Sequence, residues 1–324
     1  MIGRIVKRSV KRAFASGPGW RFVAPLVREP GVIVLTYHRI NGTDRSLEGI
    51  SIDAFERHMR WIKDHCEVIE PGAIQEHASG RRRSRPAVVV SFDDGYKDYH
   101  DLAYPVLERL RIPAVVFLAT SFMDQGGMIW TEEVQWTVNN ARKARVTLPW
   151  SQETVTLDGA ASRTKLSTTI RRHLKTLPDT ERRATLDVLV KELDAPPVRE
   201  RQMLSWDEVR AASRYTRWGG HSHTHPILSR LTREAAEREI ATCRDRIHAE
   251  TGTAPTLFAY PNGQPADFTA ETKEILQKNG FRIAFATTEG IAGPDSDWMA
   301  VKRLPSGEFD VPDFVWTASG MMRG

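Results

Sequence analysis

Short runs of consecutive apolar residues, most of them β-branched, recur along the chain and predict its β-strands. The strongest runs occupy residues 32–37, 87–92 and 114–119, and weaker ones occupy 256–260 and 283–287. Continuous apolar runs are typical of strands buried on both faces, whereas a strand with one solvated face alternates apolar and polar positions. We therefore expect these segments to form a covered sheet.

Apolar residues at helical spacing fill the intervals between these runs. Their positions predict helices over residues 53–66, 98–110, 232–250 and 267–279. Strands that alternate with helices predict an α/β fold with a parallel sheet or barrel.

Residues from about 125 to 205 interrupt this alternation. The segment is rich in charged residues, is mostly helical in pattern and ends near Pro196-Pro197. We interpret it as a helical insertion over one end of a single domain that spans residues 31–324. A basic segment, residues 1–30, precedes that domain.

Charge changes the picture at the amino terminus. The chain of 324 residues has a net charge of +5, and basic clusters lie at residues 4–12 and 81–85. Neither aromatic stacking positions nor a reading helix accompany them, so we do not expect nucleic-acid binding. On a helix, residues 2–14 would present an apolar and a basic face, which is typical of a peripheral membrane contact. A short helix packed on its own domain, or a basic tail, explains the pattern equally well.

The remaining composition favours the cytoplasm, with attachment to the inner membrane face through residues 2–14 as a further expectation. No run approaches the roughly 20 apolar residues of a membrane span, and the start lacks the apolar core of a secretory signal. Cys66 and Cys243 are too few and too far apart for a disulfide framework, so we expect both to be reduced thiols.

Two adjacent carboxylates end the second strong apolar run. Asp93 and Asp94 follow Phe92 and precede Gly95. Burying even one charge at such a place is costly unless the charge is paired or binds a metal. A helix N-cap followed by a turn at Gly95 explains the pair about as well, so both interpretations stay open on spacing alone.

Three of the ten histidines, His221, His223 and His225, lie within five residues after a Gly-Gly turn. A spacing of four would place the first and last imidazoles on one face of a helical turn. Two imidazoles and one carboxylate leave room for water in a zinc shell, as in a catalytic site, and a spare carboxylate is a natural general base. His38, at the end of the first strand, is either an acid–base residue at the same rim or a ring bonded to a loop.

Three motifs in this order resemble the NodB-like polysaccharide deacetylase family, the fourth family of carbohydrate esterases. Ser91-Phe-Asp-Asp-Gly95 resembles the first family motif, His221-Ser-His-Thr-His-Pro226 the second and Phe258-Ala-Tyr-Pro-Asn-Gly263 the third. Each motif alone is weak, but their joint occurrence at strand ends is specific. The resemblance covers most of residues 31–310 and implies a distorted (β/α) barrel of about seven strands.

The resemblance also implies roles for the residues in the first two motifs. Asp94, His221 and His225 match the metal ligands, and Asp93 matches the catalytic base. The metal would be divalent, with Zn²⁺ expected first and Co²⁺ or Ni²⁺ as alternatives. His223 falls on a variable position of its motif.

The third motif implies a loop beside the substrate. Tyr260, Pro261 and Asn262 would line the groove, and the backbone N–H near Asn262 would bind the oxyanion.

Two departures from the commonest family pattern affect the remaining roles. The carboxy-terminal acid histidine is absent, and the segment that ends at His38 resembles the circularly permuted poly-N-acetylglucosamine deacetylase branch, so the resemblance assigns the acid role to His38. The fourth motif is unclear: Asp295 and Asp297 have its letters without its spacing, and Arg303 is a second candidate for orienting the base.

The implied activity is removal of N-acetyl groups from amino sugars of a poly- or oligosaccharide, with release of acetate. One competing hypothesis is a deacetylase or deformylase of a lipid-linked or small amino-sugar conjugate. Another, from a different class, is a glycan-binding barrel without catalysis. The presence of Asp93 together with the three candidate ligands favours an enzyme.

Overall fold

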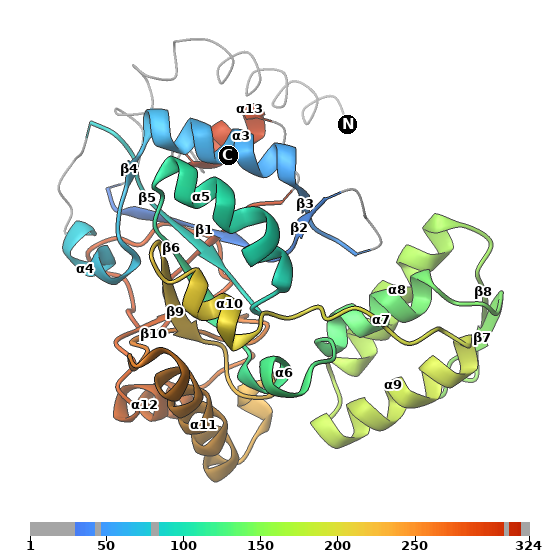
Figure 1. Ribbon diagram of the computed structural model, residues 1–324. Coiled ribbons are helices and arrows are strands. Elements are labelled where there is room, and N and C mark those ends of the chain that lie inside the picture. The colour runs from blue at the N-terminus through green and yellow to red at the C-terminus, as the bar shows by residue number, and fades with distance from the viewer. Residues whose placement is uncertain (1–29, 43–46, 79–83, 308–310, 319–324) are drawn as a thin grey trace. The chain divides into compact units, whose positions relative to one another are not determined.

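The computed structural model describes residues 30–42, 47–78, 84–307 and 311–318 (Figure 1). The proposed basic segment 1–30, with its candidate membrane contact 2–14, therefore lies outside the described residues except for Pro30. The described residues fall into two compact units. The first lies within residues 1–42, 49–124 and 204–324, and the second within 43–48 and 125–203.

The first unit is built on a parallel sheet. Its eight strands run in the order β11 (Ile283–Phe285), β10 (Leu257–Ala259), β9 (Thr216–Gly220), β6 (Ala114–Leu118), β5 (Ala87–Phe92), β1 (Val32–Tyr37) and β12 (Leu304–Pro305), with β4 (Glu67–Val68) beside the start of β5. Every pair in this sheet is parallel, so all of its strands end at the same edge.

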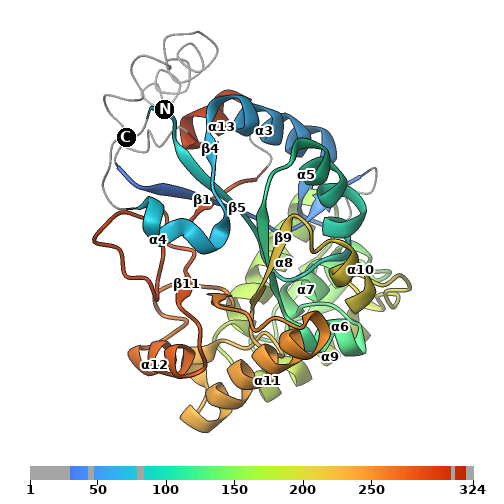
Figure 2. The same ribbon diagram turned by 60° about the vertical axis from the view of Figure 1, so that its left-hand side comes forward.

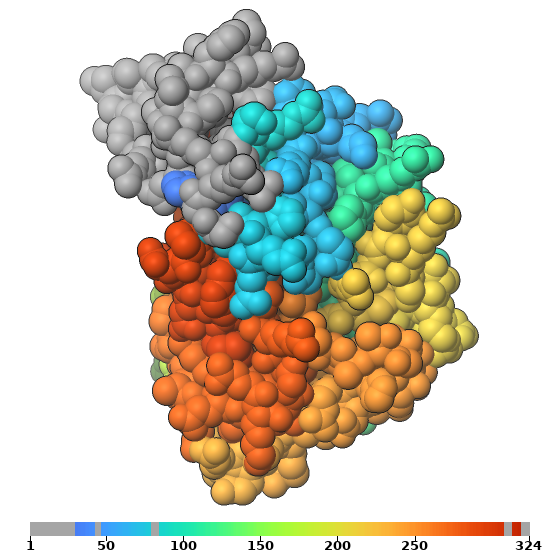
Figure 3. All heavy atoms as spheres, turned by 90° about the vertical axis from the view of Figure 1, so that its left-hand side faces the viewer, coloured from blue at the N-terminus to red at the C-terminus, as the bar shows by residue number. Residues whose placement is uncertain are grey.

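Residues 301–305 complete the ring of strands. Val301 pairs in parallel with Phe285 of β11, and Leu304 pairs with Leu35 of β1. One short segment thus joins the two ends of the sheet. In Figure 3 this part of the chain, coloured orange to red, adjoins the blue and cyan segments from its first third. The expected distorted (β/α) barrel is confirmed.

Strand residues alternate between two cores, which explains the continuous apolar runs. In β1, Val32 and Val34 pack inside the barrel with Val89 and Phe117, whereas Ile33 and Leu35 pack outward under the helices. In β1, β5 and β6 both faces therefore exclude water, as expected for parallel strands covered by helices.

Helices cover the outer face of the sheet, and Figure 2 shows α13 beside α3. The longer ones are α3 (Ile52–His65), α5 (Tyr104–Leu110), α11 (Arg233–Thr251), α12 (Ala270–Lys278) and α13 (Val311–Ala318). Short elements connect them: β2 (Ile40–Asn41), β3 (Ile50–Ser51), η1 (Pro71–Ala73), α4 (Ile74–His77), η2 (Tyr99–Ala103), α6 (Thr120–Gln125), α10 (Trp206–Ala211) and η3 (Leu228–Arg230).

The second unit has a core of its own. It contains the helices α7 (Trp130–Asn139), α8 (Ala160–Leu174) and α9 (Asp179–Leu193) and an antiparallel hairpin of β7 (Arg145–Thr147) and β8 (Thr154–Thr156). Its buried residues, among them Val138, Ile170 and Leu189, form one separate cluster.

Two elements differ in detail from what the sequence predicts. The helix expected over 98–110 begins as a π-helical turn, η2, before α5, whose second residue is Pro105; proline has no N–H for the usual bond. Gly219-Gly220 is the end of strand β9 and not a turn. Cys66 and Cys243 are buried and are not joined in a disulfide, as expected. No helix in the described part of the chain combines the length and apolar character needed to span a bilayer.

Candidate active site

Each of the predicted chemical segments lies at the carboxyl edge of the sheet. His38 follows β1, Asp93 and Asp94 follow β5, and His221 follows β9. Because the strands are parallel, their ends meet at one rim, which is where α/β barrels place their functional groups. All of these residues belong to the first unit.

Asp94, His221 and His225 converge on one point. The Nε2 atoms of His221 and His225 lie 3.2 and 3.3 Å from the same atom, Oδ1 of Asp94. All three side chains are buried, and their candidate ligand atoms lie within 4.8 Å of one another. The structure therefore brings together the residues that the sequence analysis assigned to a metal.

The chemistry of these atoms fits a cation. Nδ1 of His221 lies 2.7 Å from the carbonyl oxygen of Ala259, which can only accept, so Nδ1 carries a proton. The Nε2 lone pair of the neutral ring then points at a carboxylate oxygen, and that arrangement needs a proton or a metal between the two atoms. A backbone carbonyl that fixes the tautomer in this way is usual behind metal-binding histidines. Nδ1 of His225 is buried without a partner among the described residues.

A strained loop, and not the expected helical turn, brings the two imidazoles together. Ser222 and His225 have φ values of +62° and +59°, which is the left-handed region that side-chain-bearing residues rarely occupy. The Ser222 hydroxyl accepts the N–H of His225 at 3.1 Å and closes the loop on itself. Strain of this kind persists where surrounding structure enforces it, often at functional sites.

Asp93 lies beside the three-residue cluster and is paired on its other side. Arg303 donates two hydrogen bonds to its carboxylate, at 2.7 and 2.8 Å, and both side chains are almost fully buried. Burial alone would raise the pKa of Asp93, but the Arg303 guanidinium outweighs it and holds that pKa below its ordinary value. Burial also acts to raise the pKa of Asp94, yet hydrogen bonds from His221 and His225 bring it well below its ordinary value. Both carboxyls are thus ionised at neutral pH.

His38 is the exposed member of the group. Its Nε2 lies 3.8 Å from Oδ2 of Asp93, and 53% of its side chain is open to solvent. A bulky substrate could therefore contact the His38 imidazole without any rearrangement of the core.

In the loop after β10, the expected groove residue Tyr260 is instead part of the core. Tyr260 is fully buried, donates its hydroxyl to Met299 and stacks on Phe268. Asn262 has a φ of +62°, and its Nδ2 is buried without a partner among the described residues. Pro261 is buried between them.

Of the three residues considered for orienting the base, the structure places Arg303 against Asp93. Asp297 instead accepts from Lys273 and from the Met299 N–H, and Asp295 is exposed. A second group of potential ligands, His100, Asp101 and Glu208, is only partly buried.

A pocket of about 500 Å³ lies at the opposite end of the strands. It is lined by residues at the starts of β9 and β10 and around α4, among them Glu70, Arg217 and Trp218. Two of its charged groups, Arg217 and Glu70, form an ion pair with each other.

Comparison with known proteins decides the family. The family model described as polysaccharide deacetylase matches residues 80–146 and 153–284. The chain belongs to the polysaccharide deacetylase family. The match includes Asp93, Asp94 and the histidine loop.

Individual members of the family match over shorter stretches. The poly-beta-1,6-N-acetyl-D-glucosamine N-deacetylase of Escherichia coli (strain K12) is 24% identical over 98 residues, which are 29% of this chain and 15% of that protein. YxkH of Bacillus subtilis (strain 168) is 33% identical over 87 residues, 26% of this chain and 30% of that protein. The chain thus matches less than a third of either relative.

Two solved structures share the fold over almost their whole length. The deacetylase PplD of Streptococcus pyogenes, solved in complex with acetate, has a TM-score of 0.62 at 14% identity and covers 90% of this chain and 99% of its own. IcaB from Ammonifex degensii has a TM-score of 0.58 at 18% identity, covering 90% and 98%. At these identities the likeness establishes the fold alone.

Proposed function

We propose that this chain is a metal-dependent hydrolase that removes N-acetyl groups from amino sugars of a poly- or oligosaccharide and releases acetate. The observation that supports this proposal best is the convergence of Asp94, His221 and His225 next to an ionised carboxylate, Asp93. A purely structural ion pair would not need three acceptor-rich side chains at one buried point. Family membership supplies the substrate class.

Asp94, His221 and His225 would hold the divalent ion, with Zn²⁺ as the first expectation from two imidazoles and one carboxylate. Co²⁺ and Ni²⁺ are the alternatives. When bound, such an ion polarises an amide carbonyl and lowers the pKa of water toward ~7.

The residues around this position divide the proton transfers between them. Asp93, kept ionised by Arg303, takes the proton of the attacking water. His38, on the exposed side of Asp93, gives a proton to the leaving nitrogen of the sugar. Arg303 touches no reacting atom and orients the base.

The loop at Asn262 would receive the negative charge that develops on the amide oxygen. It begins directly after Ala259, whose carbonyl bonds His221, so the loop starts beside the candidate ligands. The backbone N–H of Asn262 has no hydrogen-bond partner among the described residues. Unpaired N–H groups of this kind stabilise an oxyanion, with ~3–4 kcal/mol as a typical effect of one donor.

Acetate release from N-acetylated oligosaccharides tests the proposal. The panel contains oligomers of poly-β-1,6-N-acetyl-D-glucosamine, chitin oligomers and a lipid-linked N-acetylamino sugar, each also prepared in N-formyl form. We expect acetate from at least one glycan, loss of activity with a chelator and recovery with zinc.

Other outcomes would point to the competing hypotheses. Formate without acetate would establish a deformylase, and activity confined to the lipid-linked sugar would replace the polysaccharide as substrate. Glycan binding by a chain that takes up no metal and releases neither acid would contradict catalysis and leave a binding barrel.

A further inference from the structure

We propose that Glu239 of α11 is a positioning residue that holds the histidine loop, residues 221–225, in its metal-binding shape. The inference rests on the proposed function, because it assumes that His221 and His225 bind an ion. It concerns a residue outside the three sequence motifs.

The histidine loop needs an external support because its own bonds do not determine its shape. Two of its residues, Ser222 and His225, occupy left-handed backbone conformations. The second of these is itself a candidate ligand, so relaxation of its backbone would move its imidazole away from Asp94. The bond from His225 N–H to Ser222 Oγ closes the turn but ties the loop to nothing outside.

Glu239 supplies three bonds to the centre of this loop. Its Oε2 accepts the backbone N–H groups of His223 and Thr224 at 2.9 and 2.8 Å, and its Oε1 accepts the Thr224 hydroxyl at 2.7 Å. A carboxylate that accepts two successive backbone N–H groups fixes the plane of the peptide between them. The bonds reach residues 223 and 224, which lie between the two histidine ligands.

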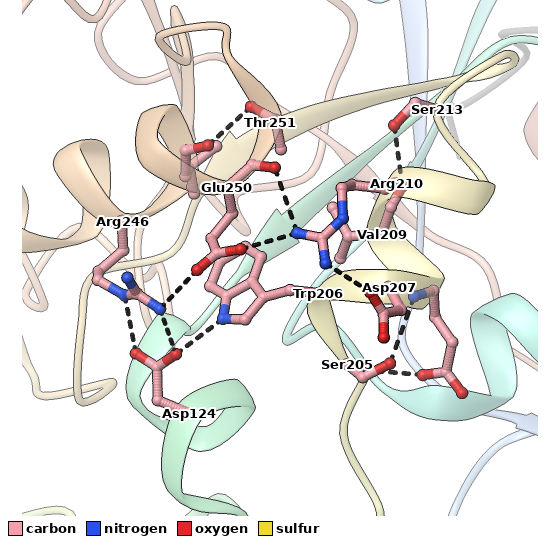
Figure 4. A network of polar contacts seen from close by, with 12 residues as sticks. Asp124, Ser205, Trp206, Asp207, Val209, Arg210, Ser213, Arg246, Glu250 and Thr251 are labelled. Carbon is pink, nitrogen blue, oxygen red and sulfur yellow. Dashed lines mark hydrogen bonds and ion pairs between the residues drawn. The ribbon is translucent and has the colours of Figure 1, made fainter.

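The helix that presents Glu239 is itself anchored. Two turns further along α11, Arg246 donates to both carboxylate oxygens of Asp124 at the end of α6, and Trp206 of α10 donates to the same carboxylate (Figure 4). Glu250 accepts from Arg246 and from Arg210 of α10. Cys243, one turn after Glu239, lies against the carbonyl of Leu118 at the end of β6.

A second set of contacts reaches the loop from α6. Thr120 of α6 pairs its hydroxyl with Nδ1 of His223, and the N–H of Ser121 bonds the His223 carbonyl. The loop is therefore held between α6 and α11, and Glu239 is the only acid among these direct contacts.

Zinc affinity of the purified full chain, measured by competition with a chromophoric chelator, tests the inference. We expect Glu239→Gln and Glu239→Ala to weaken zinc binding by about 10–100-fold, the usual effect of residues that orient ligands. Thr224→Ala, which removes one of the three bonds at an exposed position, should weaken binding less. Excess zinc should restore turnover, because all three ligands remain.

Glu237→Ala is the matched control. Glu237 lies on the same helix and is also ion-paired, but with Lys278 at 2.7 Å and away from the loop. The Glu237→Ala variant should bind zinc as the wild type does. If the loss of any carboxylate from this helix weakened binding, Glu237→Ala and Glu239→Ala would both bind zinc less tightly.

The outcomes separate this inference from the proposed function. Wild type that binds no zinc would overturn both. Zinc binding that is normal in wild type and unchanged in Glu239→Gln would overturn the positioning role alone. If Glu239→Ala does not fold, Glu239→Gln decides: weakened zinc binding in the folded variant supports the role, and wild-type binding contradicts it.

Discussion

The two ends of the same parallel strands carry charge in opposite ways. At the carboxyl end, Asp94, His221 and His225 are buried, and the two imidazole Nε2 atoms face one carboxylate oxygen, so that a proton or a metal ion must lie between them. At the amino end, Arg217 and Glu70 are largely exposed and neutralise each other. The first arrangement requires a cation, while the second is complete by itself.

A pocket alone does not distinguish the two ends. The amino end has a pocket of about 500 Å³, yet Arg217 and Glu70 in its lining are paired with each other. A functional site is better recognised by buried polar groups that have no partner within the protein. Nδ1 of His225 and Nδ2 of Asn262, both buried without a partner among the described residues, meet that description.

The largest expected effect comes from removing a ligand at the carboxyl end. Asp94→Ala should lower zinc affinity by more than about 100-fold, beyond the range for residues behind the ligands, and should abolish acetate release. His223→Ala is the control, because the His223 ring contacts Thr120 and not Asp94. Equal zinc loss in both variants, measured by metal analysis of folded protein, would contradict the ligand assignment.

Asp93→Asn should lower the rate of catalysis while leaving zinc binding intact. The amide keeps the size of the carboxylate but cannot take a proton, so we expect a fall in kcat of about 10²–10⁴-fold with zinc retained. Steady-state kinetics at saturating zinc measure the effect. Wild-type kcat would exclude Asp93 as the base.

Removing the partner of the base should destabilise the fold in a pH-dependent way. Arg303→Met leaves the buried Asp93 carboxylate unpaired, so we expect a loss of about 3–5 kcal/mol in the free energy of unfolding at pH 7. Arg303 lowers the pKa of Asp93 in the folded state, so its contribution is present above the ordinary Asp value of about 3.9 and is lost as pH falls through the folded pKa.

Denaturant unfolding of wild type and Arg303→Met at pH 7 and near pH 3 measures this difference. The gap between the two proteins should narrow at the lower pH. A gap that is independent of pH would mean that Arg303 acts through packing and not through the charge of Asp93.

The smallest effect is expected at the amino end. Arg217→Ala breaks an exposed ion pair, which is typically worth about 0–1 kcal/mol, and should leave zinc affinity unchanged. A large loss of activity in this variant would show that the amino end also contributes to activity, and would contradict the distinction between the two ends of the strands.

The strongest apolar runs predicted β1, β5 and β6 closely because both faces of these strands are buried. Strand β9 escaped prediction because its sequence, Thr-Arg-Trp-Gly-Gly, has no such run. The structure explains the glycine: a Cβ at Gly219 would lie 2.5 Å from the Phe117 ring. The space for that side chain is filled by a neighbour from another strand, which periodicity cannot reveal.

The residues that meet at the site could be named from the sequence motifs, but not all of their geometry could be predicted. The spacing of His221 and His225 suggested a helical turn, whereas a left-handed loop unites them. Arg303 could be named only as one of three candidates, since its partner Asp93 lies 210 positions away. Glu239 resembles any other acid on a solvated helix, and only the folded loop shows its three bonds.

A crystal of the zinc-loaded chain, with anomalous data collected at the zinc edge, shows directly whether the three residues hold one ion. We expect one strong peak within about 2.0–2.2 Å of Asp94 Oδ1, His221 Nε2 and His225 Nε2. No peak at that point, or a sole peak at His100, Asp101 and Glu208, would contradict it.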